Sequence, residues 1–242
     1  MQTYEPLNTL KPFGEGLWIV DGPLIRMDLG PFKVPFPTRM CVARLADGGL
    51  WVHSPIAPDE GLFEQIDALG PVAHLVAPNS IHYWYMADWL ARYPEARSHA
   101  VADLVTCAKR PFRIDDPLDE PRPRAWDGEI DWLLVPGTKV NEAVFFHRAS
   151  RTVLLADLIE NFEGRKVDNP LLRVLIRLAG GMDPDGKVPI DLRLTFWPKR
   201  ADVRRRIAQA VAWEPERVVM AHGRPYEANG ADEMRRAFRW AL

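Results

Sequence analysis

Short apolar runs separated by turn residues fill the first fifty positions of the chain. The runs at 40–45 and 50–53 flank Asp47-Gly48-Gly49, a sequence typical of a β-hairpin turn. The segment 30–37 is apolar but contains three prolines, which cannot donate to a β-ladder. We therefore predict antiparallel β-structure over these positions, with an exposed apolar loop at 30–37.

Helical spacing alternates with apolar strands from residue 59 onward. Apolar residues recur at helical spacing over 59–69 until Gly70-Pro71 ends the pattern. The same reasoning predicts helices at 82–92 and 102–109 and strands at 72–77 and 97–101. The proline-rich and acid-rich segment 111–131 is typical of a surface loop.

The second half of the chain repeats this succession of strands and helices. It begins with a β group predicted at 131–135, 143–147 and 152–156. A helix at 170–179 ends at Gly180-Gly181, and 183–198 has no regular pattern. The remaining predicted elements are a helix at 200–213, a strand at 217–221 and a helix at 230–242.

This order of elements predicts an α+β protein built as a four-layer αββα sandwich. Two successive blocks of strands and helices favour two sheets packed together with helices outside them. A doubly wound sheet fits less well, because the opening and the middle of the chain have antiparallel patterns. The sequence contains no clean linker, so we expect residues 1–242 to form a single domain.

The amino-acid composition argues against nucleic acid and membranes as binding partners. Apolar residues make up 47% of the chain, charged residues 26%, and the formal net charge is −2, so nucleic acid is not an expected partner. No apolar run is long enough for a membrane span, and the first residues lack a signal-peptide layout. We therefore expect a cytoplasmic protein that does not bind membranes. The two cysteines are far apart, which argues against a cysteine-built zinc site.

Polar side chains stand at the ends of four predicted strands, where loops hold chemical groups over a rigid sheet. His53 follows the first of these strands, and Asn79 and His82 follow the second. Asp157 and His222 follow the third and the fourth. Imidazole and carboxylate groups suit zinc, iron or manganese, and a histidine also suits general-base catalysis.

These strand ends, in this order and at these intervals, resemble the metallo-β-lactamase superfamily over roughly residues 15–225. The corresponding segments are Val52-His53-Ser54-Pro55, Ala77-Pro78-Asn79-Ser80-Ile81-His82-Tyr83, Pro136-Gly137-Thr138, Ala156-Asp157 and Ala221-His222-Gly223. The resemblance implies an αββα fold with a site for two metal ions, supplied by about five histidines and two aspartates. It is closer still to a family of uncharacterised function related to that superfamily.

Several residues depart from the superfamily pattern. Without gaps, Pro78 and Ser80 occupy the first two histidine positions, His82 replaces an aspartate and Tyr83 replaces a histidine. A slip of one residue would instead place His82 on that last histidine. Thr138 stands at a further histidine position. What remains of the implied site is a degenerate centre of His82, Asp157 and His222, enough for one metal ion but not for two.

Two functions follow from this degenerate centre, and the sequence does not separate them. In the first, the protein hydrolyses an ester, lactone or phosphoester with at most one zinc, iron or manganese ion, held by His82, Asp157 and His222. Asp157 and Glu142 are then the catalytic candidates, and Asn79, Thr138 and His53 are pocket candidates. In the second, the fold binds a small molecule or a protein partner without metal. The apolar segment 171–178 predicts core, a lid or a homodimer contact.

Overall fold

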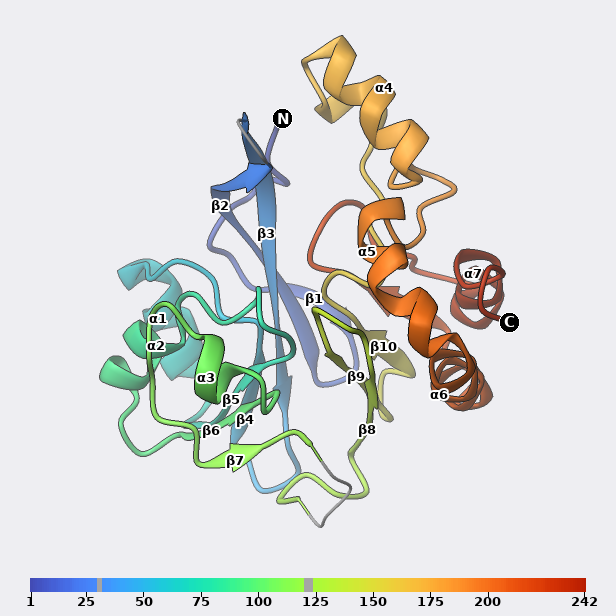
Figure 1. The fold of residues 1–242 in the computed structure, drawn as a ribbon. Helices are drawn as coiled ribbons and strands as arrows, with labels where there is room; N and C mark the ends of the chain where they lie inside the picture. Colours follow the sequence, from blue (N-terminus) through green and yellow to red (C-terminus); the bar gives the residue numbers. More distant parts are fainter. Residues whose placement is uncertain (30–31, 120–123) are drawn as a thin grey trace.

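The computed structural model describes residues 1–29, 32–119 and 124–242. Two sheets face each other, with helices α1, α2 and α3 outside the first and α4 to α7 on the side of the second (Figure 1). The α+β, four-layer αββα architecture predicted from the sequence is confirmed. Within the described residues, no helix is both long enough and apolar enough to cross a membrane.

The first sheet has seven strands in the order β1-β2-β3-β4-β5-β6-β7. It is antiparallel from β1 to β4 and parallel from β4 to β7. Its strands are β1 (Lys11–Gly14), β2 (Leu17–Leu29), β3 (Phe32–Arg44), β4 (Leu50–His53), β5 (Val72–Ala77), β6 (Arg97–Ala100) and β7 (Asp116–Pro117).

The second sheet has four strands in the order β11-β10-β9-β8. Its strands β10 and β11 are parallel and its other pairs are antiparallel. The strands are β8 (Ile130–Val135), β9 (Glu142–His147), β10 (Thr152–Leu154) and β11 (Arg217–Val219). The α-helices are α1 (Glu60–Leu69), α2 (Met86–Arg92), α3 (Leu104–Cys107), α4 (Pro170–Ala179), α5 (Ile190–Phe196), α6 (Arg200–Ala212) and α7 (Gly230–Ala237).

Aromatic side chains from both sheets fill the space between them. Trp51 of β4 contacts Phe145 of β9 and Trp126, with ring centroids 5.0 and 5.8 Å apart. All three residues are fully buried. Burying an aromatic side chain is among the largest single contributions to a core, so these contacts hold the two sheets, and the loops at their ends, in a fixed relation.

The segment 30–37 is not the exposed loop that its prolines predicted. Residues 30–31 lie outside the described part of the chain, but β3 begins at Phe32 and pairs with β2 through Pro35 and Phe36. Strand β4 joins β3 only from Cys41 onward. Pro35 and Pro37 therefore lie where β3 has one strand neighbour, and a missing N–H interrupts no second ladder there.

Several helices differ from the prediction, and α3 and α7 are shorter than the predicted 102–109 and 230–242. Helix α2 begins at Met86 rather than 82, because the Asn79 side chain accepts hydrogen bonds from the backbone N–H groups of Ile81 and His82 and holds them in a turn. Helix α5 occupies 190–196, where no regular structure was expected. Its seven residues show no complete apolar period, and the burial of Phe196 in the second core anchors it instead.

Candidate functional site

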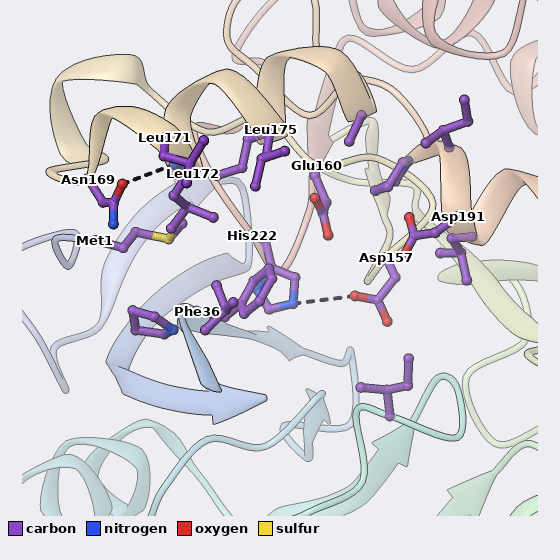
Figure 2. Close-up of a pocket in the computed structure, with 18 residues that line it drawn as sticks. Met1, Phe36, Asp157, Glu160, Asn169, Leu171, Leu172, Leu175, Asp191 and His222 are labelled. Carbon is purple, nitrogen blue, oxygen red and sulfur yellow. Dashed lines mark hydrogen bonds and ion pairs between the residues drawn. The ribbon is translucent and has the colours of Figure 1, made fainter. Parts of the chain in front are cut away.

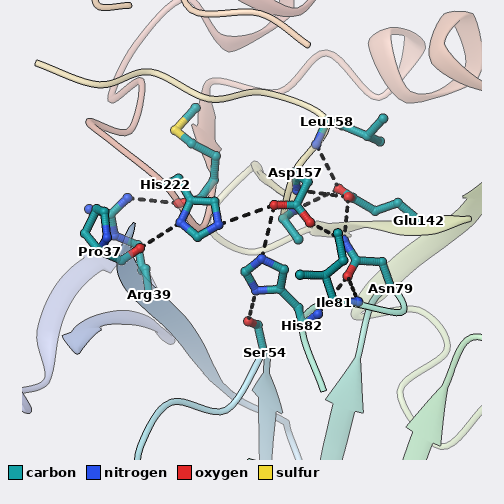
Figure 3. A network of polar contacts seen from close by, with 12 residues as sticks. Pro37, Arg39, Ser54, Asn79, Ile81, His82, Glu142, Asp157, Leu158 and His222 are labelled. Carbon is teal, nitrogen blue, oxygen red and sulfur yellow. Dashed lines mark hydrogen bonds and ion pairs between the residues drawn. The ribbon is translucent and has the colours of Figure 1, made fainter. Parts of the chain in front are cut away.

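Three loops that follow strands of both sheets meet at one edge of the sandwich (Figure 3). The loop after β5 supplies His82, the loop after β10 supplies Asp157, and the loop after β11 supplies His222. Strands β10 and β11 end two residues earlier than predicted. Asp157 and His222 therefore stand three residues beyond the sheet, where their side chains can turn toward the loop of the other sheet.

Asp157 lies at the centre of this group and is 6% exposed. Its Oδ1 atom is 3.2 Å from Nε2 of His82 and 3.3 Å from Nε2 of His222. Its Oδ2 atom accepts a hydrogen bond of 2.8 Å from the Asn79 side chain. Burial alone would raise the pKa of Asp157, but the interactions with His82 and His222 outweigh it and hold that pKa well below its usual range. The carboxyl group is therefore ionised.

His222 is fixed in one tautomer by the strand opposite. Its Nδ1 atom is 2.7 Å from the carbonyl oxygen of Pro37, and a carbonyl can only accept, so Nδ1 carries the hydrogen. In the neutral ring, Nε2 then presents a lone pair toward the Asp157 carboxylate. The following residue, Gly223, has φ of +97° and its position for a Cβ lies 2.2 Å from the Asn161 carbonyl oxygen, so the sharp turn there requires glycine.

His82 has a partner that suits either tautomer. Its Nδ1 atom is 2.8 Å from the Ser54 hydroxyl, which can donate or accept. The imidazole can therefore present Nε2 to Asp157 either with or without a hydrogen. Its ring centroid is 5.1 Å from that of His222, so the two histidines flank Asp157 at close range.

Glu142 and Asn79 form a buried layer behind Asp157. One Glu142 oxygen accepts from the Ala156 N–H at 2.8 Å, and the other accepts from Asp157 N–H and Asn79 Nδ2, both at 2.9 Å. Burial and the Asp157 charge raise the pKa of Glu142 to about 7, against the lowering effect of these donors. Both residues are fully buried and neither lines the cavity described below. Glu142 and Asn79 therefore hold Asp157 from behind, and the catalytic role of Glu142 and the pocket role of Asn79 stay predictions.

Thr138 and His53, the other two pocket candidates, do not line the cavity described below. Thr138 is exposed, and its hydroxyl donates to the carbonyl of Thr195. His53 is buried between the sheets against Trp51 and Phe145. Burial, together with the His82 charge, lowers the pKa of His53 to about 3, so its ring is neutral. Each residue stands at the predicted strand end, but the His53 side chain points into the core and the Thr138 side chain lies at the surface.

A cavity of about 800 Å³ opens beside Asp157 and His222 (Figure 2). Helix α4 forms one long wall and the start of β3 lies opposite. Two more carboxyl groups, Glu160 and Asp191, stand at the same end as Asp157. Burial raises the pKa of Glu160 to about 8, His222 opposes this, and the charges of Asp157 and Asp191 add to it.

Glu160 and Asp191 were not singled out in the sequence. Glu160 lies three residues beyond the Asp157 strand end, outside its motif, and Asp191 falls in the stretch where no regular structure was expected. Their presence in the cavity depends on how the loop after β10 and the start of α5 fold back over the site. No pattern of residue types in the chain signals this arrangement.

The donor set of His82, Asp157 and His222 fits a divalent cation. One ligand atom from each lies within 4.8 Å of the others, and this is the group of histidine, cysteine and acidic residues that could hold an ion within 1–29, 32–119 and 124–242. Because Nδ1 of His222 is committed to Pro37, the contact between its Nε2 atom and the ionised Asp157 needs either a proton or a cation between the two groups. Two imidazoles and one carboxylate are ligands that zinc commonly takes.

Arg39 ties the His222 loop to the first sheet. Its Nη1 atom donates to the carbonyls of Met220 and Gly223, at 2.9 and 2.6 Å, on either side of His222. Its Nη2 atom pairs with Asp21 at 2.7 Å, and both side chains are almost fully buried. The guanidinium therefore fixes the backbone from which His222 projects.

Replacing Arg39 with methionine is expected to lower the free energy of unfolding by about 2 kcal/mol, because two carbonyls lose their donor and Asp21 loses the guanidinium while keeping Lys11 as a cationic partner. Arg39→Lys retains the charge but has one nitrogen in place of the two that bind the carbonyls and Asp21, so we expect an intermediate loss of unfolding free energy. Urea denaturation measures both. Equal stability of the methionine variant and the wild type would contradict the role assigned to Arg39.

Comparison with known proteins agrees with this architecture. The crystal structure of the metallo-β-lactamase FIM-1 from Pseudomonas aeruginosa, in a mono-zinc form, is similar over 96% of this chain and 94% of that one, with a TM-score of 0.64 and 13% identity. A metallo-β-lactamase from Hirschia baltica gives a TM-score of 0.62 at 12% identity, covering 96% of this chain and 97% of that one. At these identities the likeness concerns the fold alone.

The sequence matches no curated protein significantly. A family model described as a domain of unknown function, DUF4336, matches residues 24–168, which is more than half of the chain. That range contains the end of β2 and the whole of β3 to β10 and includes His82, Glu142 and Asp157, whereas His222 lies beyond it. The chain therefore belongs to the DUF4336 family, and it has the fold of the metallo-β-lactamases.

Proposed function

We propose that this chain is a hydrolase that uses one divalent metal ion, zinc, iron or manganese, to cleave an ester, lactone or phosphoester. His82, Asp157 and His222 would hold the ion. The main support is the fixed tautomer of His222, whose Nδ1 hydrogen is committed to Pro37 and whose Nε2 faces Asp157 at 3.3 Å. The cavity next to these residues gives a substrate access to them.

The metal ion would supply Lewis acidity, which lowers the pKa of a water molecule and polarises the oxygen of the bond to be cleaved. The chain itself orients the reacting groups. Asn79 holds Oδ2 of Asp157 so that Oδ1 faces the two histidines. Glu160 lines the same end of the cavity, and in its ionised form, which predominates above its pKa of about 8, it would accept the proton of an attacking water.

We infer that the centre is degenerate and holds one ion rather than two. At two positions where the superfamily resemblance implies histidines, the side chains have other partners. The Tyr83 hydroxyl accepts from the Lys109 N–H at 2.8 Å, and Thr138 donates to Thr195 at 2.8 Å. A catalytic zinc site needs only three protein ligands and one open position, so His82, Asp157 and His222 suffice for a single ion.

Metal content tests this proposal directly. Protein purified without chelator is expected to contain close to one zinc, iron or manganese ion per chain by elemental analysis. His222→Ala and Asp157→Asn remove a donor each and should lose that metal. His147→Gln is the matched control, because it replaces a buried histidine of the same sheet that lies at the far end of β9, and it should retain the metal.

Thermal unfolding gives a second measurement. Added to protein that has first been stripped of metal with a chelator, zinc at about 100 times its Kd stabilises the fold by ~2.7 kcal/mol, which for a chain of this size corresponds to several degrees in Tm. We expect this shift in the wild type and in His147→Gln but not in Asp157→Asn. A protein without metal, with no shift on adding zinc, would contradict the proposal and favour a metal-free binding protein. In that protein, Asp157 would be balanced by the histidines alone.

A further inference from the structure

Polar and apolar residues are separated along the cavity. Of its 18 lining residues, five are polar, and four of these, Asp157, Glu160, Asp191 and His222, stand together at one end. The fifth, Asn169, lies toward the other end of helix α4 (Figure 2), where its side chain caps that helix by accepting from the Leu172 N–H. The length between the two ends is therefore apolar.

Helix α4 forms the apolar wall along that length. It presents Leu171, Leu172, Leu175, Ile176 and Ala179 to the cavity. From Leu171 to Ala179 the helix rises about 12 Å, at 1.5 Å per residue. Phe36 of β3 and Ile190 of α5 line the cavity as well. Leu171 and Leu175 remain 66% and 53% exposed, so the cavity leaves a strip of large apolar surface that the protein itself does not cover.

We propose that the cavity binds a linear acyl chain, whose neutral ester group lies at Asp157 and His222 and whose hydrocarbon tail lies along α4. The substrate class is thus a medium-chain acyl ester or lactone, and only the placement of the ester group rests on the proposed function. A chain of methylenes fits a long apolar wall that offers no hydrogen-bond partner between its ends. Each methylene that moves from water onto that wall adds binding free energy.

The charges at the polar end favour a neutral head group over a free fatty acid. Asp157, Glu160 and Asp191 are three carboxyl groups at that end, with His222 as the basic residue among the lining residues there. In the metal-free protein a carboxylate ligand would meet like charge, foremost that of Asp157, whereas an ester carbonyl would not. An acyl ester therefore suits both ends of the cavity.

The rates of hydrolysis of p-nitrophenyl acetate, butyrate, hexanoate, octanoate and decanoate by the zinc-loaded protein test this inference. We expect kcat/KM to rise by up to about fourfold per added methylene until the wall is filled. Equal kcat/KM across the series would overturn the acyl-chain assignment while leaving the hydrolase standing. All esters are used below their micelle-forming concentrations.

Two leucines of α4 provide a matched pair of variants. Leu175 lines the cavity, whereas Leu178 does not, and both are exposed residues of one helix. Leu175→Asp should remove the rise of kcat/KM with chain length, and so lower kcat/KM for the decanoate tenfold or more. Leu178→Asp should leave that rise unchanged. Ile190→Asp, on α5, repeats the test if Leu175→Asp disturbs α4. Equal effects of the 175 and 178 variants would contradict the assignment.

Binding of a neutral ketone separates this inference from the proposed function. By calorimetry, 2-decanone should bind at least tenfold more tightly than 2-butanone, with or without zinc, and Leu175→Asp should abolish the difference. If no ester is hydrolysed but this difference is found, the acyl cavity stands and the hydrolase does not. If both ketones bind equally weakly, the acyl cavity is wrong whatever the activity.

Discussion

Replacing Glu142 with leucine is expected to lower the free energy of unfolding by about 4 kcal/mol, and to abolish metal binding at the candidate centre. The carboxylate accepts from the backbone N–H groups of Ala156 and Asp157 and from the Asn79 side chain. Leucine has a similar size but no acceptor, so these buried donors lose their partner. Each buried donor left unpaired costs about 1–3 kcal/mol. Urea denaturation at pH 7 measures the loss.

Glu142→Gln separates hydrogen bonding from charge. The glutamine oxygen can still accept from one pair of donors, but its NH2 group meets the Asn79 NH2 or a backbone N–H. We therefore expect a loss of about 2 kcal/mol, between the wild type and Glu142→Leu. Elemental analysis of both variants reports whether Asp157 is still held in place. If Glu142→Leu were as stable as the wild type and kept its metal, Glu142 would not be the residue that positions Asp157.

The architecture could be predicted from the sequence because the spacing of apolar residues and the turn residues determine helices and strands over short stretches of chain. Helix α4 has the predicted bounds 170–179, since Asn169 caps its first turn and Gly180, with φ of +95°, ends it. The β3–β4 hairpin follows from the Asp47-Gly48-Gly49 turn. The extended arm of β3 was not predicted, because a rule against proline in strands applies where both edges are paired, and Pro35 lies where β3 has one neighbour.

The candidate site was only partly accessible from the sequence. His82, Asp157 and His222 follow strands, and the structure brings them together as a set that could hold an ion. Thr138 occupies a comparable position in the resemblance, yet its side chain turns to Thr195. A strand end fixes where a loop begins but not the direction of each side chain. Glu160 reaches the cavity through the fold of the loop itself, for which the chain carries no short-range signal.

Burial of His147 predicts that the stability of the fold decreases as the pH falls below neutral. His147 is 2% exposed, and burial lowers its pKa from 6.5 to about 4. A base whose pKa falls on folding keeps its full contribution to stability above its unfolded pKa of 6.5, and that contribution is lost as the pH falls toward the folded value. Between pH 7 and pH 4, His147 is therefore expected to cost the wild type about 3 kcal/mol of stability.

His147→Gln isolates this effect from other groups that titrate over the same range. Glu160 has a raised pKa, so its protonation stabilises the fold as the pH falls and opposes the histidines. The Ser150 hydroxyl lies 2.8 Å from Nδ1 of His147. Because this hydroxyl does not titrate between pH 4 and pH 7, it adds no pH dependence of its own. Urea denaturation of both proteins at pH 7 and pH 4 should show that the difference in stability, wild type minus variant, falls by about 3 kcal/mol on acidification. A difference that stays constant with pH would mean that His147 titrates alike in the folded and the unfolded chain, so that burial does not lower its pKa.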